Sequence, residues 1–389
     1  MNKKAIAILG AIFLLIVGTL GFLIYTKYGT KSSVTPPVSQ GSNDAGSGAN
    51  NNTPSSTAPT SAAAPVVQQN ASPFVELISD QVVSPVLFFN GKGITYFDNQ
   101  GNLYQASFQD NSTPLQIASK QSLDIEARAG IAKVLWPAKG DNFIAQFTTA
   151  SGTDWSFYNS SAQSYTDLPP QVEALDWLPS GDQIYYIWLQ NGKATLNISN
   201  PDTTNWKYIA DMWETDDQIS VSPDGKNILY YEQNSSGTAN PINLTTPDGK
   251  VWKTLVRAGF NKGVLWSPDS QKFLFGKLDS ASNQYQLWYY NLLTGETINL
   301  QATTTPDKAV WSNDSQTIYY AEPVSGVAGG NSLTSDKFYK LNIQTGDKQT
   351  YDPGSQVFDG RNLFLSSDET KLFFKNAQDG GLYYLNLNQ

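Results

Sequence analysis

The sequence contains no cysteine and no histidine among its 389 residues. Without cysteine the chain can form no disulfide bond, and thiol chemistry is excluded. Histidine is the most common metal ligand and the most common general base at neutral pH. Its absence excludes histidine-based zinc sites and every Ser-His or Cys-His catalytic arrangement. No other catalytic motif is present, and we expect neither a metal centre nor a bound cofactor.

Basic residues are scarce as well. Lys and Arg number 25 against 34 Asp and Glu, which gives a formal net charge of −9, and the pI is about 4.6. Nucleic-acid-binding proteins need a basic surface, so this charge argues against nucleic acid as a partner. Glycine and proline are plentiful, at 30 and 20 residues, and aromatic residues make up 12%. A composition rich in turn formers and aromatics is typical of all-β proteins.

One phrase recurs along the chain: an apolar pair, an anchor residue, a tight turn and a run of alternating apolar residues. Its clearest copy is VLWSPDSQKFLFG at 264–276. The anchors follow one another at intervals of 41, 44, 45, 45 and 54 residues, and they are Trp136, Trp177, Val221, Trp266, Trp311 and Leu365. A period of roughly 40–45 residues built from short strands and turns is typical of β-propeller blades.

Each repeat is expected to contain four short strands, seen best at Val264–Ser267, Lys272–Leu278, Tyr285–Leu292 and Glu296–Leu300. Gly295, in the last turn, is free to take a positive φ. A weaker unit at Pro85–Ser119 brings the number of repeats to seven. The final repeat has only three strands. Phe74–Ser79, before the first repeat, has the pattern of a strand but belongs to no repeat. We therefore predict an all-β, seven-bladed β-propeller whose N-terminal strand closes the last blade and covers its edge.

The phrases WSPDSQKFLF at 266–275, VSPDGKNILYY at 221–231 and LLTGETINL at 292–300 closely resemble the TolB-type, WD-like β-propeller repeat. The resemblance extends over 73–389 and is sharpest at 219–300. The second and third repeats depart from it, with PAKGD and PSGDQ in place of the Ser-Pro-Asp-Gly turn. The resemblance implies a fold and no particular activity, because propellers serve binding proteins and enzymes alike.

The N-terminal part differs from the repeats. Residues 5–25 form an uncharged apolar run, long enough for a single transmembrane helix of about 20 residues. Lys3 and Lys4 precede it, which favours a cytoplasmic N-terminus, and a cleaved signal peptide is the alternative. Residues 30–72 are low in complexity and are expected to form a disordered linker. We thus expect three parts: 1–29 as cytoplasmic tip and helix, 30–72 as linker, and 73–389 as a propeller outside the cytoplasm.

Two sets of repeated residues are expected to be structural. The anchor tryptophans occupy one equivalent position in each blade, which favours packing of blade against blade over stacking on a ligand. The turn aspartates Asp224, Asp269 and Asp314 lie in separate blades, whereas calcium needs six to eight converging oxygens. Capping of their own turns is therefore the better interpretation.

The three arginines are the strongest site candidates. Arg128, Arg257 and Arg361 are expected in the connections that lead into innermost strands, where they would line one mouth of the central channel and bind an anion. The alternative is that they neutralise the nearby carboxylates Asp124, Glu126 and Asp359. On the same mouth we expect a mixed aromatic and charged rim that includes Trp213, Glu214 and Lys262, with Asp216, Asp217 and Phe260 beside them.

Three functions are compatible with these features. The favoured one is a membrane-anchored, monomeric module of the cell envelope that binds another envelope protein, a peptide or a glycan. The alternative is an extracellular carbohydrate-active enzyme, a glycosidase or lyase. It would need paired carboxylates in the channel, and the pairs to test are Glu173 with Asp176 and Glu214 with Asp217. The third is a structural part of an envelope assembly, with an apolar plug in the channel.

Overall fold

A computed structural model describes residues 72–388, with gaps at 89–90, 151, 213–217, 233–239, 260 and 331. The apolar run at 5–25 and the linker at 30–72, apart from Ser72 at its end, lie outside the described residues. Within the described part of the chain, no helix is long and apolar enough to cross a membrane.

The described residues form seven antiparallel sheets of four strands each, so the predicted seven-bladed β-propeller is confirmed. Six blades are continuous in sequence and run from the innermost to the outermost strand. Blade 1 comprises β2 (Val83–Phe88), β3 (Gly93–Phe97), β4 (Leu103–Phe108) and β5 (Ile117–Ser122); blade 2 comprises β6 (Ile131–Leu135), β7 (Phe143–Thr149), β8 (Gly152–Asn159) and β9 (Ser164–Asp167); blade 3 comprises β10 (Val172–Trp177), β11 (Ile184–Gln190), β12 (Lys193–Ser199) and β13 (Lys207–Met212).

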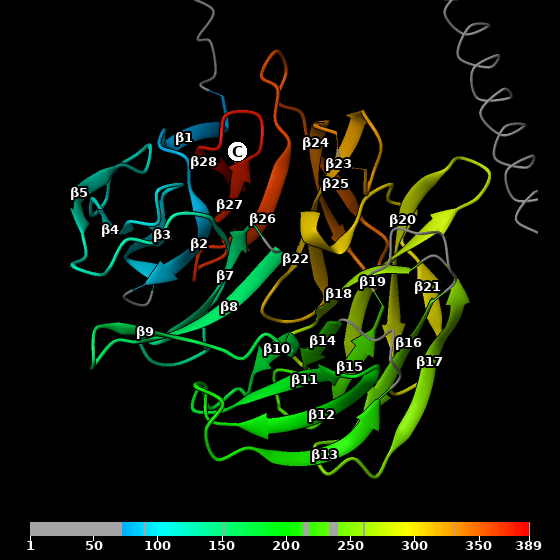
Figure 1. Cartoon of the computed structure of the whole chain (residues 1–389). Coiled ribbons are helices and arrows are strands. Elements are labelled where there is room, and N and C mark those ends of the chain that lie inside the picture. Colours follow the sequence, from blue (N-terminus) through cyan, green and yellow to red (C-terminus); the bar gives the residue numbers. More distant parts are fainter. Residues whose placement is uncertain are drawn as a thin grey trace, which may run out of the picture. The chain divides into compact units, whose positions relative to one another are not determined.

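The remaining blades follow the same plan around a common centre (Figure 1). Blade 4 comprises β14 (Gln218–Val221), β15 (Ile228–Tyr231), β16 (Asn240–Thr245) and β17 (Trp252–Gly259); blade 5 comprises β18 (Asn261–Trp266), β19 (Lys272–Asp279), β20 (Gln284–Asn291) and β21 (Thr297–Asn299); blade 6 comprises β22 (Ala309–Trp311), β23 (Thr317–Ser325), β24 (Ser335–Asn342) and β25 (Lys348–Tyr351), preceded by the short 3-10 helix η2 (Pro306–Lys308). Gly295, between β20 and β21, has the predicted positive φ, at 74°.

Blade 7 closes the ring with a strand from the other end of the repeats. Its strands are β26 (Gly360–Leu365), β27 (Lys371–Asn376), β28 (Leu382–Asn386) and, outermost, β1 (Phe74–Ile78). β1 pairs antiparallel with β28, and Figure 1 shows the two side by side. The predicted completion of the last blade by the N-terminal strand is therefore confirmed.

The hydrophobic core lies between blades. Seven clusters of buried side chains are found among the described residues, and each joins two neighbouring blades. The cluster between blades 6 and 7 includes Phe338 and Phe374, whose ring centroids lie 4.6 Å apart, and Phe74 of β1 packs on both. Burial of apolar surface between sheets is the main stabilising term, so each blade depends on both of its neighbours.

The anchor tryptophans also link the blades by hydrogen bonds. The indole N–H of each donates to a backbone carbonyl on the innermost strand of the preceding blade. The pairs are Trp136 with Ser84, Trp177 with Leu135, Trp266 with Ser220 and Trp311 with Leu265. The turn aspartates accept hydrogen bonds within their own turns, as Asp269 does from Ser267 and from the backbone N–H of Gln271. Both predicted structural roles are confirmed.

Candidate functional site

A cavity of about 960 Å³ lies at the centre of the ring. Its walls come mainly from the innermost strands of blades 2, 4, 5, 6 and 7, which identifies it as part of the central channel. The residues that matter for its charge are Lys133, Lys262, Asp307, Asp359, Arg361 and Lys375.

β-Bulges set the direction of three of these side chains. The register of β6 shifts between Ile131 and Lys133, that of β18 between Lys262 and Val264, and that of β26 between Arg361 and Phe364. A bulge adds a residue to one strand and thereby re-aims the neighbouring side chains, and bulges are common beside functional sites. Lys133, Lys262 and Arg361 thus reach the cavity next to an irregular position of an inner strand.

A buried ion cluster supports one wall of the cavity. The Lys308 ammonium lies 2.6 Å from an oxygen of Asp336 and 2.7 Å from one of Asp359, and all three side chains are at most 2% exposed. Arg361 donates to both oxygens of Asp359: its Nε lies 2.8 Å from the oxygen that Lys308 also contacts, and its Nη2 lies 3.2 Å from the other. Its Nη1 reaches the more exposed Asp307 at 3.2 Å. Helix η2 supplies both Asp307 and Lys308, so it anchors blade 6 to the first strand of blade 7.

The cluster separates the pKa values of its two buried carboxylates. Burial alone would raise the pKa of Asp359, but hydrogen bonds from Arg361 and Lys308 outweigh it and lower the pKa to about 2. Burial raises the pKa of Asp336, and the attraction of Lys308 opposes this shift without cancelling it. Two cations and three carboxylates give the cluster one net negative charge when all are ionised, so Arg361 is already neutralised by protein groups.

Three lysines on the cavity wall remain without a carboxylate. Lys133, Lys262 and Lys375 form no ion pair with any residue that the structure describes, although Lys262 donates to the backbone carbonyl of Gly329 at 2.6 Å. Water reaches Lys133 in the cavity, yet protein atoms surround it, and burial lowers its pKa while Asp176 acts against the shift. Burial lowers the pKa of Lys375 as well. Among the described residues, the wall therefore carries an excess of positive charge.

Lys375 and Arg361 are direct partners in the pairing of β26 with β27. Like charges directly opposite each other in a sheet repel. Asp359 and Asp307 offset the charge of Arg361, so Lys375 is the member of this pair that has no ion-pair partner among the described residues.

The three arginines do not converge as the sequence suggested. Arg361 lies at the cavity with Lys262, but Arg128 and Arg257 are not among its lining residues. The guanidinium of Arg128 pairs instead with Asp167 of β9 at 2.8 Å, above the rings of Phe147 and Tyr165.

Position along the strands explains the difference. Arg128 does precede an innermost strand, but Asp167 on the outermost strand of the same blade holds it. Arg257 lies within β17, the outermost strand of blade 4, and is exposed rather than in a connection. The expected neutralisation of an arginine by Asp359 is confirmed for Arg361, whereas Arg128 uses neither Asp124 nor Glu126. Of the predicted rim, Lys262 lies at the cavity. Trp213, Glu214, Asp216, Asp217 and Phe260 lie outside the described residues.

Of the two carboxylate pairs suggested for an enzyme, Glu173 with Asp176 can be described, and Asp176 is already engaged in hydrogen bonds of the fold. Asp176 accepts hydrogen bonds from the backbone N–H groups of Trp177 and Val221, both at 2.8 Å, and so ties blade 3 to blade 4. Burial raises its pKa to about 6 although these two bonds and Lys133 act in the opposite direction. Glu173 is exposed, and the pair Glu214 with Asp217 lies outside the described residues. Among the residues described, no group of acidic side chains is placed to hold a metal ion.

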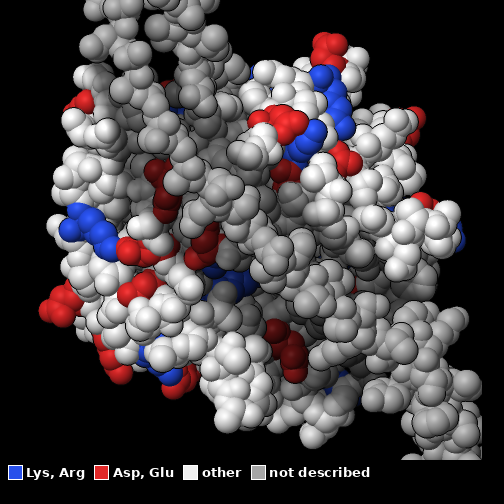
Figure 2. Space-filling model, turned by 90° about the horizontal axis from the view of Figure 1, so that it is seen from above, with Lys and Arg blue, Asp and Glu red and all other residues white. Residues whose placement is uncertain are grey.

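Sequence reasoning missed Lys133, Lys308 and Lys375. The sequence did hold one indication of them: each of these lysines lies within, or directly before, a short apolar segment of the kind that forms the inner strands of a blade. A lysine at such a position needs a partner or a water-filled space. Figure 2 shows basic side chains beside acidic ones on one face of the molecule, with no broad basic surface among its described residues.

No protein-family model matches the sequence, and no match was found among curated proteins. Solved structures with a similar fold include the oligogalacturonate lyase of Vibrio parahaemolyticus, with 10% identity and a TM-score of 0.56 over 80% of this chain and 96% of the lyase. A chain of a mitotic checkpoint complex shares 14% identity and a TM-score of 0.53, with 85% and 99% covered. TolB from Acinetobacter baumannii shares 16% identity and a TM-score of 0.42, with 82% and 80% covered. These likenesses concern the fold alone: the chain is a seven-bladed β-propeller protein, and TolB is among the propellers that it resembles.

Proposed function

We propose that this protein is a binding module that receives an acidic polypeptide segment in its central channel. The observation that carries the proposal is a set of three lysines, Lys133, Lys262 and Lys375, which line the cavity from blades 2, 5 and 7 and form no ion pair with a described carboxylate. They lie in a domain that, over 73–389, holds 21 basic and 33 acidic residues. On a domain that is negative overall, a local positive site attracts an acidic ligand to that one place. The cavity is large enough to hold several side chains.

Binding rather than catalysis fits this chemistry. The lysines are donors for carboxylates, and Arg361 is held in place by Asp359 and Asp307. Burial lowers the pKa values of Lys133 and Lys375, because it disfavours their charged forms. A ligand carboxylate beside them would stabilise the charged forms and raise these pKa values again, which favours its binding.

The test uses the full chain and a fluorescein-labelled hexaglutamate peptide, followed by fluorescence polarisation. Each lysine-to-carboxylate contact is a charge-assisted hydrogen bond of about 1.5–3 kcal/mol. Lys133→Ala or Lys375→Ala should therefore weaken binding about tenfold to a hundredfold. The affinity should also fall with rising salt, because ions screen these contacts.

The matched control is Lys226→Ala, which removes an exposed lysine from a turn of blade 4. This variant should bind the peptide as the natural chain does. Equal binding of a hexalysine peptide, or an unchanged affinity in the Lys133→Ala, Lys375→Ala double variant, would contradict the proposal.

We further propose that the apolar run at 5–25 anchors the protein in a membrane and that 30–72 holds the propeller outside the cytoplasm. The support is the composition of these two segments. Protease added to intact cells (or to spheroplasts, where an outer membrane is present) should then cut between Thr30 and Ser72 and release the propeller. A blot with an antibody against the propeller detects the fragment. Full protection until lysis would place the propeller inside the cell and contradict the proposal.

A further inference from the structure

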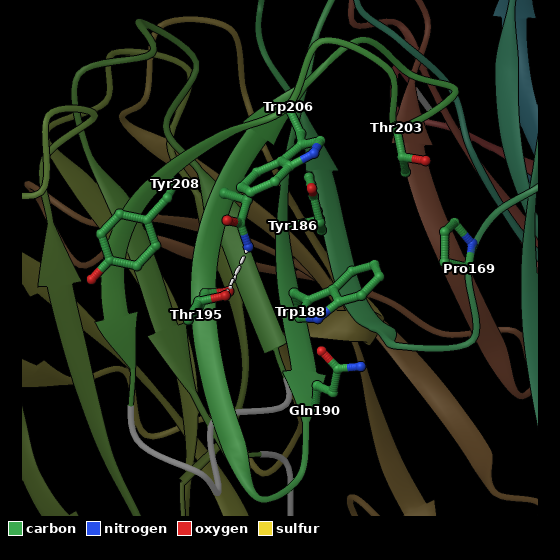
Figure 3. A pocket seen from close by; sticks show the side chains of 9 residues that line it. Pro169, Tyr186, Trp188, Gln190, Thr195, Thr203, Trp206 and Tyr208 are labelled. Carbon is green, nitrogen blue, oxygen red and sulfur yellow. Dashed lines mark hydrogen bonds between the residues drawn. The ribbon is translucent and has the colours of Figure 1, made fainter.

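A second cavity, of about 540 Å³, lies on blade 3 away from the channel. It falls within the roughly 300–1,000 Å³ typical of small-molecule sites. Four aromatic rings and several amide and hydroxyl groups line it, without any charged side chain: Pro169, Tyr186, Trp188, Gln190, Thr195, Asn197, Thr203, Trp206 and Tyr208. In Figure 3 the aromatic rings stand on the strands of blade 3, and Thr203 and Pro169 lie across from them.

The pleat of three strands creates this surface. Tyr186, Asn197 and Tyr208 are direct neighbours across β11, β12 and β13, and Trp188 pairs with Thr195 in the next row. Toward the centre of the ring the same face is covered by blade 2. Tyr186 belongs to that interface, and Trp188 is partly buried against it. The outer strands of neighbouring blades diverge, which leaves Trp206 and Tyr208 exposed to water.

Trp206 is the most unusual member of the set, because 64% of its surface is exposed. It follows a turn held by internal hydrogen bonds, in which Thr204 donates to Asp202 at 2.6 Å and Asn200 donates to Thr204 at 2.9 Å. The indole N–H groups of Trp206 and Trp188 find no acceptor among the described residues, unlike those of the four blade anchors. Trp206 thus offers an exposed ring and this N–H donor, and the turn before it is already ordered. A ligand that stacks on this ring would therefore cause little further ordering of the protein.

The polar groups define the chemistry of that ligand. Asn197 is buried and donates to the carbonyl and hydroxyl oxygens of Thr195, at 3.1 and 3.0 Å, which leaves its amide oxygen as an acceptor. Gln190 adds an amide at the far end of the cavity (Figure 3). Neutral donors and acceptors around flat aromatic faces suit a ring that has hydroxyl groups at its edge and C–H groups on its face.

We propose that this cavity binds a neutral saccharide, whose pyranose ring stacks on Trp206 while its hydroxyl groups bond to Trp188, Gln190 and Asn197. The site is independent of the channel, and it would let the module hold a glycan while the channel is free or occupied. A quaternary ammonium ion also binds to aromatic rings. The amides and hydroxyls favour the saccharide, and choline is the competing probe.

The experiment titrates the full chain with cellotriose, maltotriose and triacetylchitotriose, followed by tryptophan fluorescence and by calorimetry. At least one should bind and change the fluorescence, and Trp206→Ala should weaken its binding about tenfold or abolish it. Gln190→Ala should weaken it as well. Because Trp206 is exposed, the melting temperature should not change.

The matched control is Trp252→Ala. Trp252 opens the outermost strand of blade 4 at 39% exposure, but its indole N–H donates to Gly249 and its ring contacts Tyr230. Its removal should leave saccharide binding unchanged. The proposal is overturned if none of the three saccharides binds at millimolar concentration, if Trp206→Ala binds as the natural chain does, or if choline binds and the saccharides do not.

Discussion

Deletion of residues 73–80 is expected to leave a chain that aggregates or fails to fold. The deletion removes β1, the outermost strand of blade 7, and with it Phe74 and Ile78, which are 3% and 7% exposed. Loss of a buried phenylalanine alone costs about 3–5 kcal/mol. The paired backbone of β28 would in addition be exposed as a free edge. Together these losses approach the whole stability of a typical protein, about 5–15 kcal/mol.

Two point variants separate side-chain burial from the strand itself. Phe74→Ala should lower the free energy of unfolding by about 3–5 kcal/mol, because its ring packs on Phe338, Phe358 and Phe374. Glu76→Ala, an exposed position on the same strand, should change it by less than about 0.5 kcal/mol. Urea unfolding and size-exclusion chromatography measure these effects. A deletion variant as stable and monomeric as the natural chain would show that β1 does not close the ring.

Replacement of Lys308 by methionine is expected to destabilise the fold by about 3–5 kcal/mol at neutral pH. Lys308 is the buried partner of both Asp336 and Asp359, and it also donates to Thr334 at 2.7 Å. Removal of one member of a buried ion pair leaves the other charge without compensation. Lys250→Met removes an ion pair whose side chains are 80% and 52% exposed, and it should cost less than about 1 kcal/mol. Similar losses in both variants would contradict a structural role for the cluster.

The same cluster predicts how stability changes in acid. The pKa of Asp359 is lowered from 3.8 to about 2, so its ionised form stabilises the fold above pH 4. This contribution, about 2 kcal/mol, is lost as the pH falls from 4 to 2. The raised pKa of Asp336 acts in the opposite direction and offsets part of the loss. In Lys308→Met, Asp359 keeps Arg361, whereas Asp336 loses its cation and can escape its unpaired charge by protonation. The deficit of the variant should therefore shrink as the pH falls, which unfolding curves from pH 7 to pH 3 would measure.

The sequence alone predicted the architecture, down to the strand that closes the ring. Its signals are local: alternation of apolar residues specifies strands, and residues such as Asp269 and Gly295 specify turns within a few positions. Recurrence of these signals every 40–45 residues specified the blades. The three-stranded last repeat and the unassigned Phe74–Ser79 then left one way to pair all strands. The anchor tryptophans could be assigned to the core for the same reason, because every repeat has to bury an equivalent position.

Only the tertiary structure decided which charges face the channel. Arg128 has a similar place in its repeat to Arg361, yet Asp167 of β9 holds it at the periphery, while Arg361 meets Asp307 of η2 and Asp359. Lys133 reaches the cavity beside a bulge in β6, and a shift of one residue moves a side chain to the other face of a sheet. Such shifts, and pairings between residues far apart in the chain, depend on the positions of neighbouring strands. Local sequence patterns do not contain that information, because side chains from several blades meet only after the ring has closed.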